Sequence, residues 1–98
     1  QLKKINLNEI LYVQSLENYV IIQSETSKEI AYSPLKKIME YLPEPQFIQV
    51  HRSFVINSLK VEAIEGNQLV IQNYKIPIAR NLREATFESL LKNKLISR

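Results

Sequence analysis

His51, Arg52 and Ser53 are consecutive residues whose types could carry chemistry. Because alternate residues of a strand share one face, His51 and Ser53 would lie together, as the base and the nucleophile of a hydrolase do. The residues around Ser53 do not resemble a nucleophile elbow, and a single histidine beside a strand is usually a hydrogen-bonded structural residue. We therefore expect this chain not to be an enzyme.

The composition excludes several other kinds of site. The chain has 98 residues, with one histidine, one glycine, no cysteine and no aspartate. These counts exclude disulfides, cysteine-based zinc sites and glycine-rich phosphate loops. One histidine among scattered glutamates is a poor metal ligand set. We expect no cofactor, no metal and no small-molecule substrate.

The positive charge is concentrated toward the end of the chain. The formal net charge is +3, from 13 lysines and arginines against 10 glutamates. Residues 75–98 contain six basic and two acidic residues, and His51 and Arg52 add basic character in the middle. This distribution permits an anionic partner without requiring one.

Hydrophobic residues make up 45% of the chain, which is enough for the core of one folded domain over residues 1–98. No apolar run exceeds four residues, so we expect no membrane span. No signal peptide opens the sequence, and we expect a cytoplasmic protein. Because residue 1 is glutamine, we expect a fragment of a longer protein.

Short segments rich in β-branched and aromatic residues predict that most of the chain forms strands. Residues 3–9 are expected to form a short edge strand or a turn. Gly66-Asn67 predicts a two-residue hairpin, and Asn73-Tyr74 a second tight turn. Pro77 makes the last strand an edge strand. The predicted strands are 10–13, 19–23, 28–32, 47–50, 54–56, 60–65, 68–73 and 75–79.

Two helices are predicted, one central and one at the C-terminus. Ser33 is expected to cap the first and Pro34 to begin it. Asn81 is expected to cap the second, with Glu84 completing a capping box. Helical spacing places two sets of residues on apolar faces: Leu35, Ile38, Met39 and Leu42, and then Phe87, Leu90, Leu91 and Leu95. The predicted fold class is a mostly β domain with one central helix and one C-terminal helix.

Five segments of the chain resemble, in the same order, the LytTR family of DNA-binding domains, which are effector domains of many bacterial response regulators. The signature-like segment is Val50–Asn57, with the sequence VHRSFVIN. The other segments are Glu9–Val20, Ser33–Pro43, Phe47 and Ile76–Arg80, and the resemblance covers roughly residues 5–90.

The resemblance implies a small antiparallel β fold that reads DNA without a recognition helix. Loops at one edge of the sheet would enter successive major grooves of double-stranded DNA. The partners implied are promoter direct repeats, and dimerisation would come from a receiver domain that this chain lacks. The implied function is sequence-specific transcriptional regulation in a two-component system.

The resemblance also implies site residues. Those expected to contact DNA bases are Asn18, Tyr19, Arg52 and Arg80, and those expected to contact phosphates are His51, Lys75, Asn81 and Arg83. Arginine can bond guanine O6 and N7 together, and asparagine can pair with adenine in the same bidentate way. Five of these residues also have a structural interpretation. Arg52 would be a solvated strand residue, Arg80 a cation that blunts a sheet edge, and His51 a hydrogen-bonded structural residue. Asn18 would be a turn residue and Tyr19 a core residue.

Two other functions remain open from the sequence. The chain could be a β-rich protein-interaction module that binds a partner strand by augmentation at a free sheet edge. It could also bind single-stranded nucleic acid by stacking bases on Tyr12, Tyr19, Phe54 or Tyr74. We expect Tyr12, Phe47 and Phe54 to lie in the core, which disfavours stacking.

Overall fold

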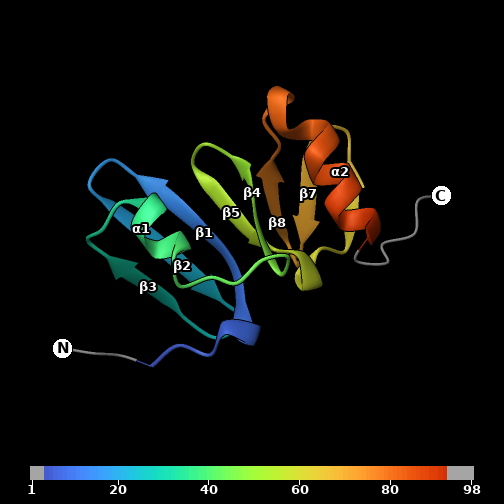
Figure 1. Ribbon diagram of the computed structural model, residues 1–98. Helices are drawn as coiled ribbons and strands as arrows, with labels where there is room; N and C mark the ends of the chain where they lie inside the picture. The colour runs from blue at the N-terminus through green and yellow to red at the C-terminus, as the bar shows by residue number, and fades with distance from the viewer. Residues whose placement is uncertain (1–3, 93–98) are drawn as a thin grey trace.

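The computed structural model describes residues 4–92 and shows strands in two sheets with two α-helices (Figure 1). The chain order is η1 (Leu7–Glu9), β1 (Ile10–Leu16), β2 (Tyr19–Ser24), β3 (Lys28–Ala31), α1 (Leu35–Met39), β4 (Phe47–His51), β5 (Phe54–Asn57), η2 (Ser58–Lys60), β6 (Ala63–Glu65), β7 (Gln68–Ile71), β8 (Tyr74–Pro77), η3 (Arg80–Leu82) and α2 (Arg83–Lys92), where η denotes a 3-10 helix. The predicted fold class is confirmed.

All strand pairs are antiparallel. One sheet has five strands in the order β3-β2-β1-β5-β4, and the other has three in the order β6-β7-β8. β8 is an edge strand, as Pro77 predicted, because a proline lacks the amide proton that a neighbouring strand would need. In the larger sheet, β1 is the central strand and pairs with β2 on one side and β5 on the other.

The core consists of two clusters that share the central strands. One cluster joins β1, β2 and β5 to α1 through residues such as Val13, Val20 and Leu35. The other joins β1, β4 and β5 to β7, β8 and α2 through residues such as Leu11, Leu69 and Leu90. β2 alternates half-buried and buried residues, as a strand with one face on a core should. The five-stranded sheet thus fixes the positions of everything packed around it.

Three local predictions are corrected by backbone hydrogen bonding. Of the two alternatives predicted for this segment, the turn is confirmed and the edge strand is wrong: residues 7–9 form one turn of 3-10 helix, in which the Asn6 side chain accepts a hydrogen bond from the Asn8 amide at 3.0 Å. The second turn is Gln72–Asn73, one residue earlier than expected, and Tyr74 begins β8. The strand predicted for 60–65 begins only at Ala63, because Asn57 caps a 3-10 helix over residues 58–60. The hairpin at Gly66 is confirmed, with a φ of 61°.

The caps predicted for both helices are wrong. Pro34, not Ser33, is the N-cap of α1, and the Ser33 hydroxyl donates to the Pro34 carbonyl oxygen instead. Asn81 lies inside η3, so α2 begins at Arg83 without the predicted capping box. At the start of α1, Pro34 sets the backbone direction, and at the start of α2 the preceding 3-10 turn η3 does so. Neither helix therefore begins at the side-chain cap that was predicted.

The apolar face predicted for the first helix is confirmed for Leu35, Ile38 and Met39, which pack against one core cluster; Leu42 is buried in the same cluster but lies beyond the end of α1 at Met39. The face predicted for α2 is partly wrong, because Leu90 is 1% exposed whereas Leu91 is 54% exposed. Adjacent helical residues point about 100° apart, and only the Leu90 side reaches the sheet. Leu95 lies outside the described residues. Within residues 4–92, the structure has no helix with the length and apolar character needed to cross a membrane.

Candidate nucleic-acid interface

Three connections lie along the same edge of the molecule, at the top of Figure 1. They are the β1–β2 turn at Glu17–Asn18, the β4–β5 turn at Arg52–Ser53, and η3, which follows β8. Residues expected to contact DNA bases lie in all three: Asn18, Arg52 and Arg80 are each exposed. Segments far apart in the sequence thus present exposed polar and cationic side chains on one edge.

Backbone hydrogen bonds fix the relative positions of these connections. The Ser15 amide donates to the Ser53 carbonyl oxygen at 2.8 Å, which joins the end of β1 to the β4–β5 turn. The Ala79 amide donates to the Val50 carbonyl oxygen at 2.8 Å, which joins the segment before η3 to β4. Because backbone bonds set these spacings, the edge is organised without depending on exposed side chains.

The β4–β5 turn presents Arg52 and holds His51. His51 Nδ1 accepts a hydrogen bond from the Ser53 amide at 3.1 Å, and its ring lies edge-on to Phe54 at 5.7 Å between centroids. The structural role considered for His51 is therefore confirmed, and Nδ1 is occupied by a backbone amide. Gln49 Nε2 donates to the Arg52 carbonyl oxygen at 3.4 Å, which further orders the turn while leaving the Arg52 side chain exposed.

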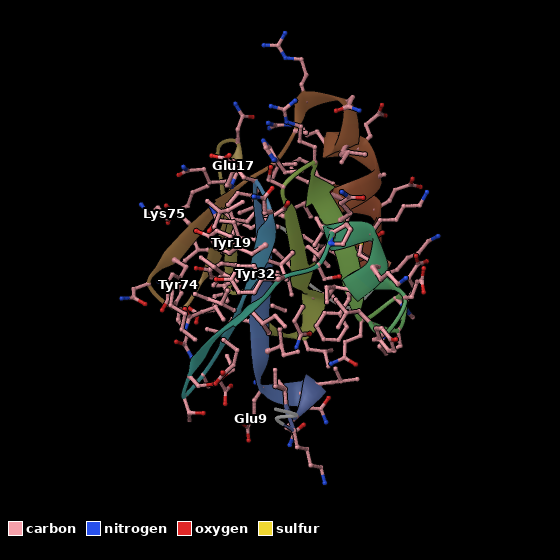
Figure 2. The ribbon with its side chains drawn as sticks, turned by 90° about the vertical axis from the view of Figure 1, so that its left-hand side faces the viewer. Glu9, Glu17, Tyr19, Tyr32, Tyr74 and Lys75 are labelled. Atoms are coloured by element: carbon pink, nitrogen blue, oxygen red, sulfur yellow. The ribbon has the colours of Figure 1, made fainter. Side chains whose placement is uncertain are left out.

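Asn18 lies in the β1–β2 turn, and the next residue, Tyr19, begins β2. Asn18 is exposed beside Glu17, whose φ of 24° is positive. Tyr19 is half-buried, and its ring lies 5.9 Å from that of Tyr32, which is 83% exposed. Figure 2 shows the labelled Tyr19 and Tyr32 close together on the side of the molecule that faces the viewer. The two adjacent predicted residues thus have different surroundings, one in the turn and one against another ring.

Arg80 and Asn81 are exposed in η3, and Arg83 is half-buried at the start of α2. The Arg83 guanidinium donates to Asn67 Oδ1 and lies 4.9 Å from the centroid of the Phe87 ring. Sequence reasoning assigned Asn67 only to a hairpin turn. The structure places it beside two of the predicted contact residues, a proximity that no local sequence pattern indicated.

Lys75 is the predicted residue that the structure does not bring to this edge. It lies near the start of β8, whereas Arg80 follows the end of that strand. Its ammonium nitrogen is 3.4 Å from Glu65 Oε1, and both side chains are well exposed. Figure 2 shows the labelled Lys75 and Tyr74 to the left of Tyr19 and Tyr32.

The aromatic residues near the centre form a packed row rather than a stacking platform. Tyr12 lies 5.2 Å from Tyr74 and 6.1 Å from Phe54, with both pairs tilted or edge-on. Burial raises the pKa of the Tyr12 hydroxyl, and the nearby Tyr74 raises it further. Tyr12 and Phe47 are buried and Phe54 is half-buried, as expected for core residues. Within the described part of the chain, no three His, Cys, Asp or Glu side chains are grouped to hold a metal ion.

Comparisons with known proteins agree on one family. The family model of the LytTr DNA-binding domain matches residues 1–91. The chain is 31% identical over 88 residues to an uncharacterised response regulatory protein of Vibrio cholerae serotype O1, covering 81% of this chain and 34% of that protein. It is 24% identical over 82 residues to a sensory transduction protein LytT of Bacillus anthracis, covering 78% of this chain and 33% of that protein.

A solved structure shares the fold. It is described as the LytTr DNA-binding domain of a putative methyl-accepting/DNA response regulator from Bacillus cereus, with a TM-score of 0.77 and 22% sequence identity. The match covers 89% of this chain and 84% of that one. The chain spans about a third of the length of the curated relatives it matches.

Proposed function

The chain belongs to the LytTR family of DNA-binding domains, and from this premise we propose that it binds specific sequences of double-stranded DNA in bacterial transcriptional regulation. The observation that carries the proposal is the alignment of Asn18, Arg52 and Arg80 along one edge, on connections joined by backbone hydrogen bonds. A preorganised edge binds a rigid duplex without first losing loop entropy.

In this proposal the three connections enter the major groove and read bases. Arg52 and Arg80 supply planar forks that match guanine O6 and N7, and Asn18 supplies an amide that matches adenine N6 and N7. Tyr19 is the fourth proposed base contact, and its partly exposed ring suits an apolar contact beside the β1–β2 turn. The groove can take such loops because each base pair presents a distinct pattern there.

The remaining predicted residues are proposed to bind phosphates. Asn81 and Arg83 lie beside Arg80, and His51 lies beside Arg52, so each could hold the backbone next to a base contact. Lys75 lies near the start of β8, but its ammonium group pairs with Glu65, which directly precedes the β6–β7 turn, so we propose that it binds a phosphate beside that turn.

We further propose that the domain is the effector of a two-component response regulator acting in the cytoplasm. The support is that two longer relatives, of which the match covers 34% and 33%, are named as response regulatory or sensory transduction proteins. A receiver domain elsewhere in such a protein would supply dimerisation, and two domains side by side would bind promoter direct repeats. One half-site gives limited contact area, so pairing would raise affinity.

The test uses a duplex that the purified domain itself enriches from a random pool. Arg52→Ala and Arg80→Ala are each expected to cost about 1–3 kcal/mol on this duplex and to relax base preference. Lys28→Ala is the matched control, because it removes a positive charge from an exposed position at the far end of β2 and β3.

If both arginine variants bind the enriched duplex as the wild type does, the proposed site is wrong. If the wild-type domain retards no duplex at all, the function itself is wrong. Salt-insensitive binding to a protein partner would then favour strand augmentation.

A further inference from the structure

A pocket lies between η3 and the β6–β7 turn, next to the proposed DNA-binding edge. It has a volume of about 330 Å³ and is lined by Asn67, Ile78, Arg80 and Arg83. Two of these residues are cations and none is acidic. Such a lining favours an anion, and arginine pairs are well suited to the oxygens of a phosphate group.

Arg83 is held in this pocket from two sides. Asn67 Oδ1 accepts a hydrogen bond from its guanidinium, and the Phe87 ring lies against it, with 4.9 Å from the guanidinium carbon to the ring centroid. Phe87 itself packs against the core that contains Leu90. A free arginine side chain has many rotamers, so contacts on two sides order it before a ligand arrives.

The β6–β7 turn is itself fixed against the segment before η3. The Ile78 amide donates to the Asn67 carbonyl oxygen at 2.8 Å. Asn67 therefore has two separate attachments, with its backbone bonded to residue 78 and its side chain bonded to Arg83. The turn is thus linked to Arg83 through the Asn67 side chain, and Arg80 lines the same pocket.

We infer that Asn67 is a positioning residue for DNA binding, which orients Arg83 so that the pocket takes one phosphate of the DNA backbone between Arg83 and Arg80. This inference rests on the proposed function and adds a residue and an element to it. The β6–β7 turn becomes a fourth connection at the interface. Asn67 acts through Arg83, and Arg83 contacts a phosphate. Because phosphate contacts carry no sequence information, the effect of Asn67 on affinity is independent of base sequence.

The experiment compares Asn67→Ala with Asn73→Ala. Both asparagines are exposed in two-residue turns of the same small sheet, but β7 separates them, and Asn73 lies at the end away from the pocket. Asn67→Ala is expected to weaken binding about three- to tenfold, the loss expected for one hydrogen bond of ordinary strength. The loss should be equal on the enriched duplex and on an unrelated one, and Asn73→Ala should bind as the wild type does.

Salt dependence separates positioning from a merely structural role. Arg83→Ala should reduce the slope of log affinity against log salt by about one unit, because one phosphate contact is lost. Asn67→Ala should shift the slope in the same direction although it removes no charge. An unchanged slope for Asn67→Ala, with normal thermal unfolding, would overturn the inference.

A double variant measures the coupling directly. If Asn67 acts through Arg83, the variant carrying both Asn67→Ala and Arg83→Ala binds no more weakly than Arg83→Ala alone. If the two losses multiply, Asn67 acts independently and the positioning role is wrong. This outcome leaves the proposed function intact, because Arg52→Ala and Arg80→Ala still report on base reading.

The same protein variants test whether the phosphate in the pocket belongs to the DNA backbone or is free inorganic phosphate. Replacing single phosphates of the enriched duplex by neutral methylphosphonates should identify one position where wild-type affinity falls and Asn67→Ala affinity does not. Inorganic phosphate is titrated without DNA at constant ionic strength, and the NMR shifts of the backbone amides around the pocket are followed. These shifts should show no saturable binding of inorganic phosphate. Saturation by inorganic phosphate with no sensitive methylphosphonate position would overturn the assignment to DNA.

Discussion

Arg52 shows how much can depend on the shape of one side chain rather than its charge. It is exposed at a turn that is ordered by Gln49 and by the His51–Ser53 hydrogen bond. We predict that Arg52→Lys keeps binding to an unrelated duplex near the wild-type level but loses about 1–3 kcal/mol on the enriched duplex, because lysine lacks the bidentate fork. Titrations of both duplexes check this, and equal losses on the two would mean that Arg52 contacts only phosphate.

Asn57 is a buried residue whose side chain makes two hydrogen bonds, one that joins β5 to β1 and one that caps η2. Its Nδ2 donates to the Ile10 carbonyl oxygen at 2.8 Å, and its Oδ1 accepts from the Leu59 amide at 3.0 Å. Asn57→Ala leaves both backbone groups without this partner, so we predict a loss of about 1–3 kcal/mol in the free energy of unfolding. Urea unfolding measures it. An unchanged midpoint would show that water replaces both bonds without cost.

At the residue scale, sequence reasoning worked where a residue type has one dominant use. The expectation that Tyr12 lies in the core is confirmed. The partnership of Asn67 with Arg83 could not be predicted, because it joins residues of two elements whose relative placement depends on the tertiary fold. The DNA contacts themselves stay predictions.

The two leucines at the end of α2 give a direct test at the scale of elements. Leu90→Ala should cost about 2–5 kcal/mol in the free energy of unfolding, because it leaves a cavity in the core. Leu91→Ala should cost less than about 0.5 kcal/mol, because that side chain is 54% exposed. Chemical denaturation of the matched pair checks both. Equal losses would mean that α2 is rotated from the orientation described.

The β6–β7 hairpin depends on the backbone of one glycine. Gly66 has a φ of 61°, and a Cβ added there would meet nothing within 4 Å. Gly66→Ala should therefore cost only the backbone penalty of the left-handed region, about 1–2 kcal/mol. Gly66→Asn should cost less, because asparagine tolerates this region. Thermal unfolding compares the two, and a Gly66→Ala variant as stable as the wild type would contradict the turn geometry.

Element types were predictable and their ends were not. The strands and both helices are where alternation, helical spacing and the Gly-Asn pair indicated. The N-terminal caps predicted for the two helices were wrong. Pro34 caps α1 in place of Ser33, and Asn81 lies in η3, which precedes α2. Capping patterns describe an isolated helix, whereas here the neighbouring backbone already sets where each helix begins.

At the scale of the whole molecule, the five-stranded sheet explains why distant segments meet. Strands β1, β4 and β5 are neighbours or near neighbours, so the turns at their ends fall on one edge, and the smaller sheet adds η3 beside them (Figure 1). The sequence could not reveal this arrangement without the family resemblance, because strand order depends on pairing between residues far apart in the chain.

The most direct test of the central claim is selection of random duplex DNA on the purified domain, with the enriched pool titrated at two salt concentrations. The account predicts that a short motif emerges, that the wild type prefers it at both concentrations, and that a pool selected on Arg80→Ala lacks it. A pool in which nothing is enriched, with retention that falls uniformly as salt rises, would contradict the account. It would leave only a nonspecific cationic surface.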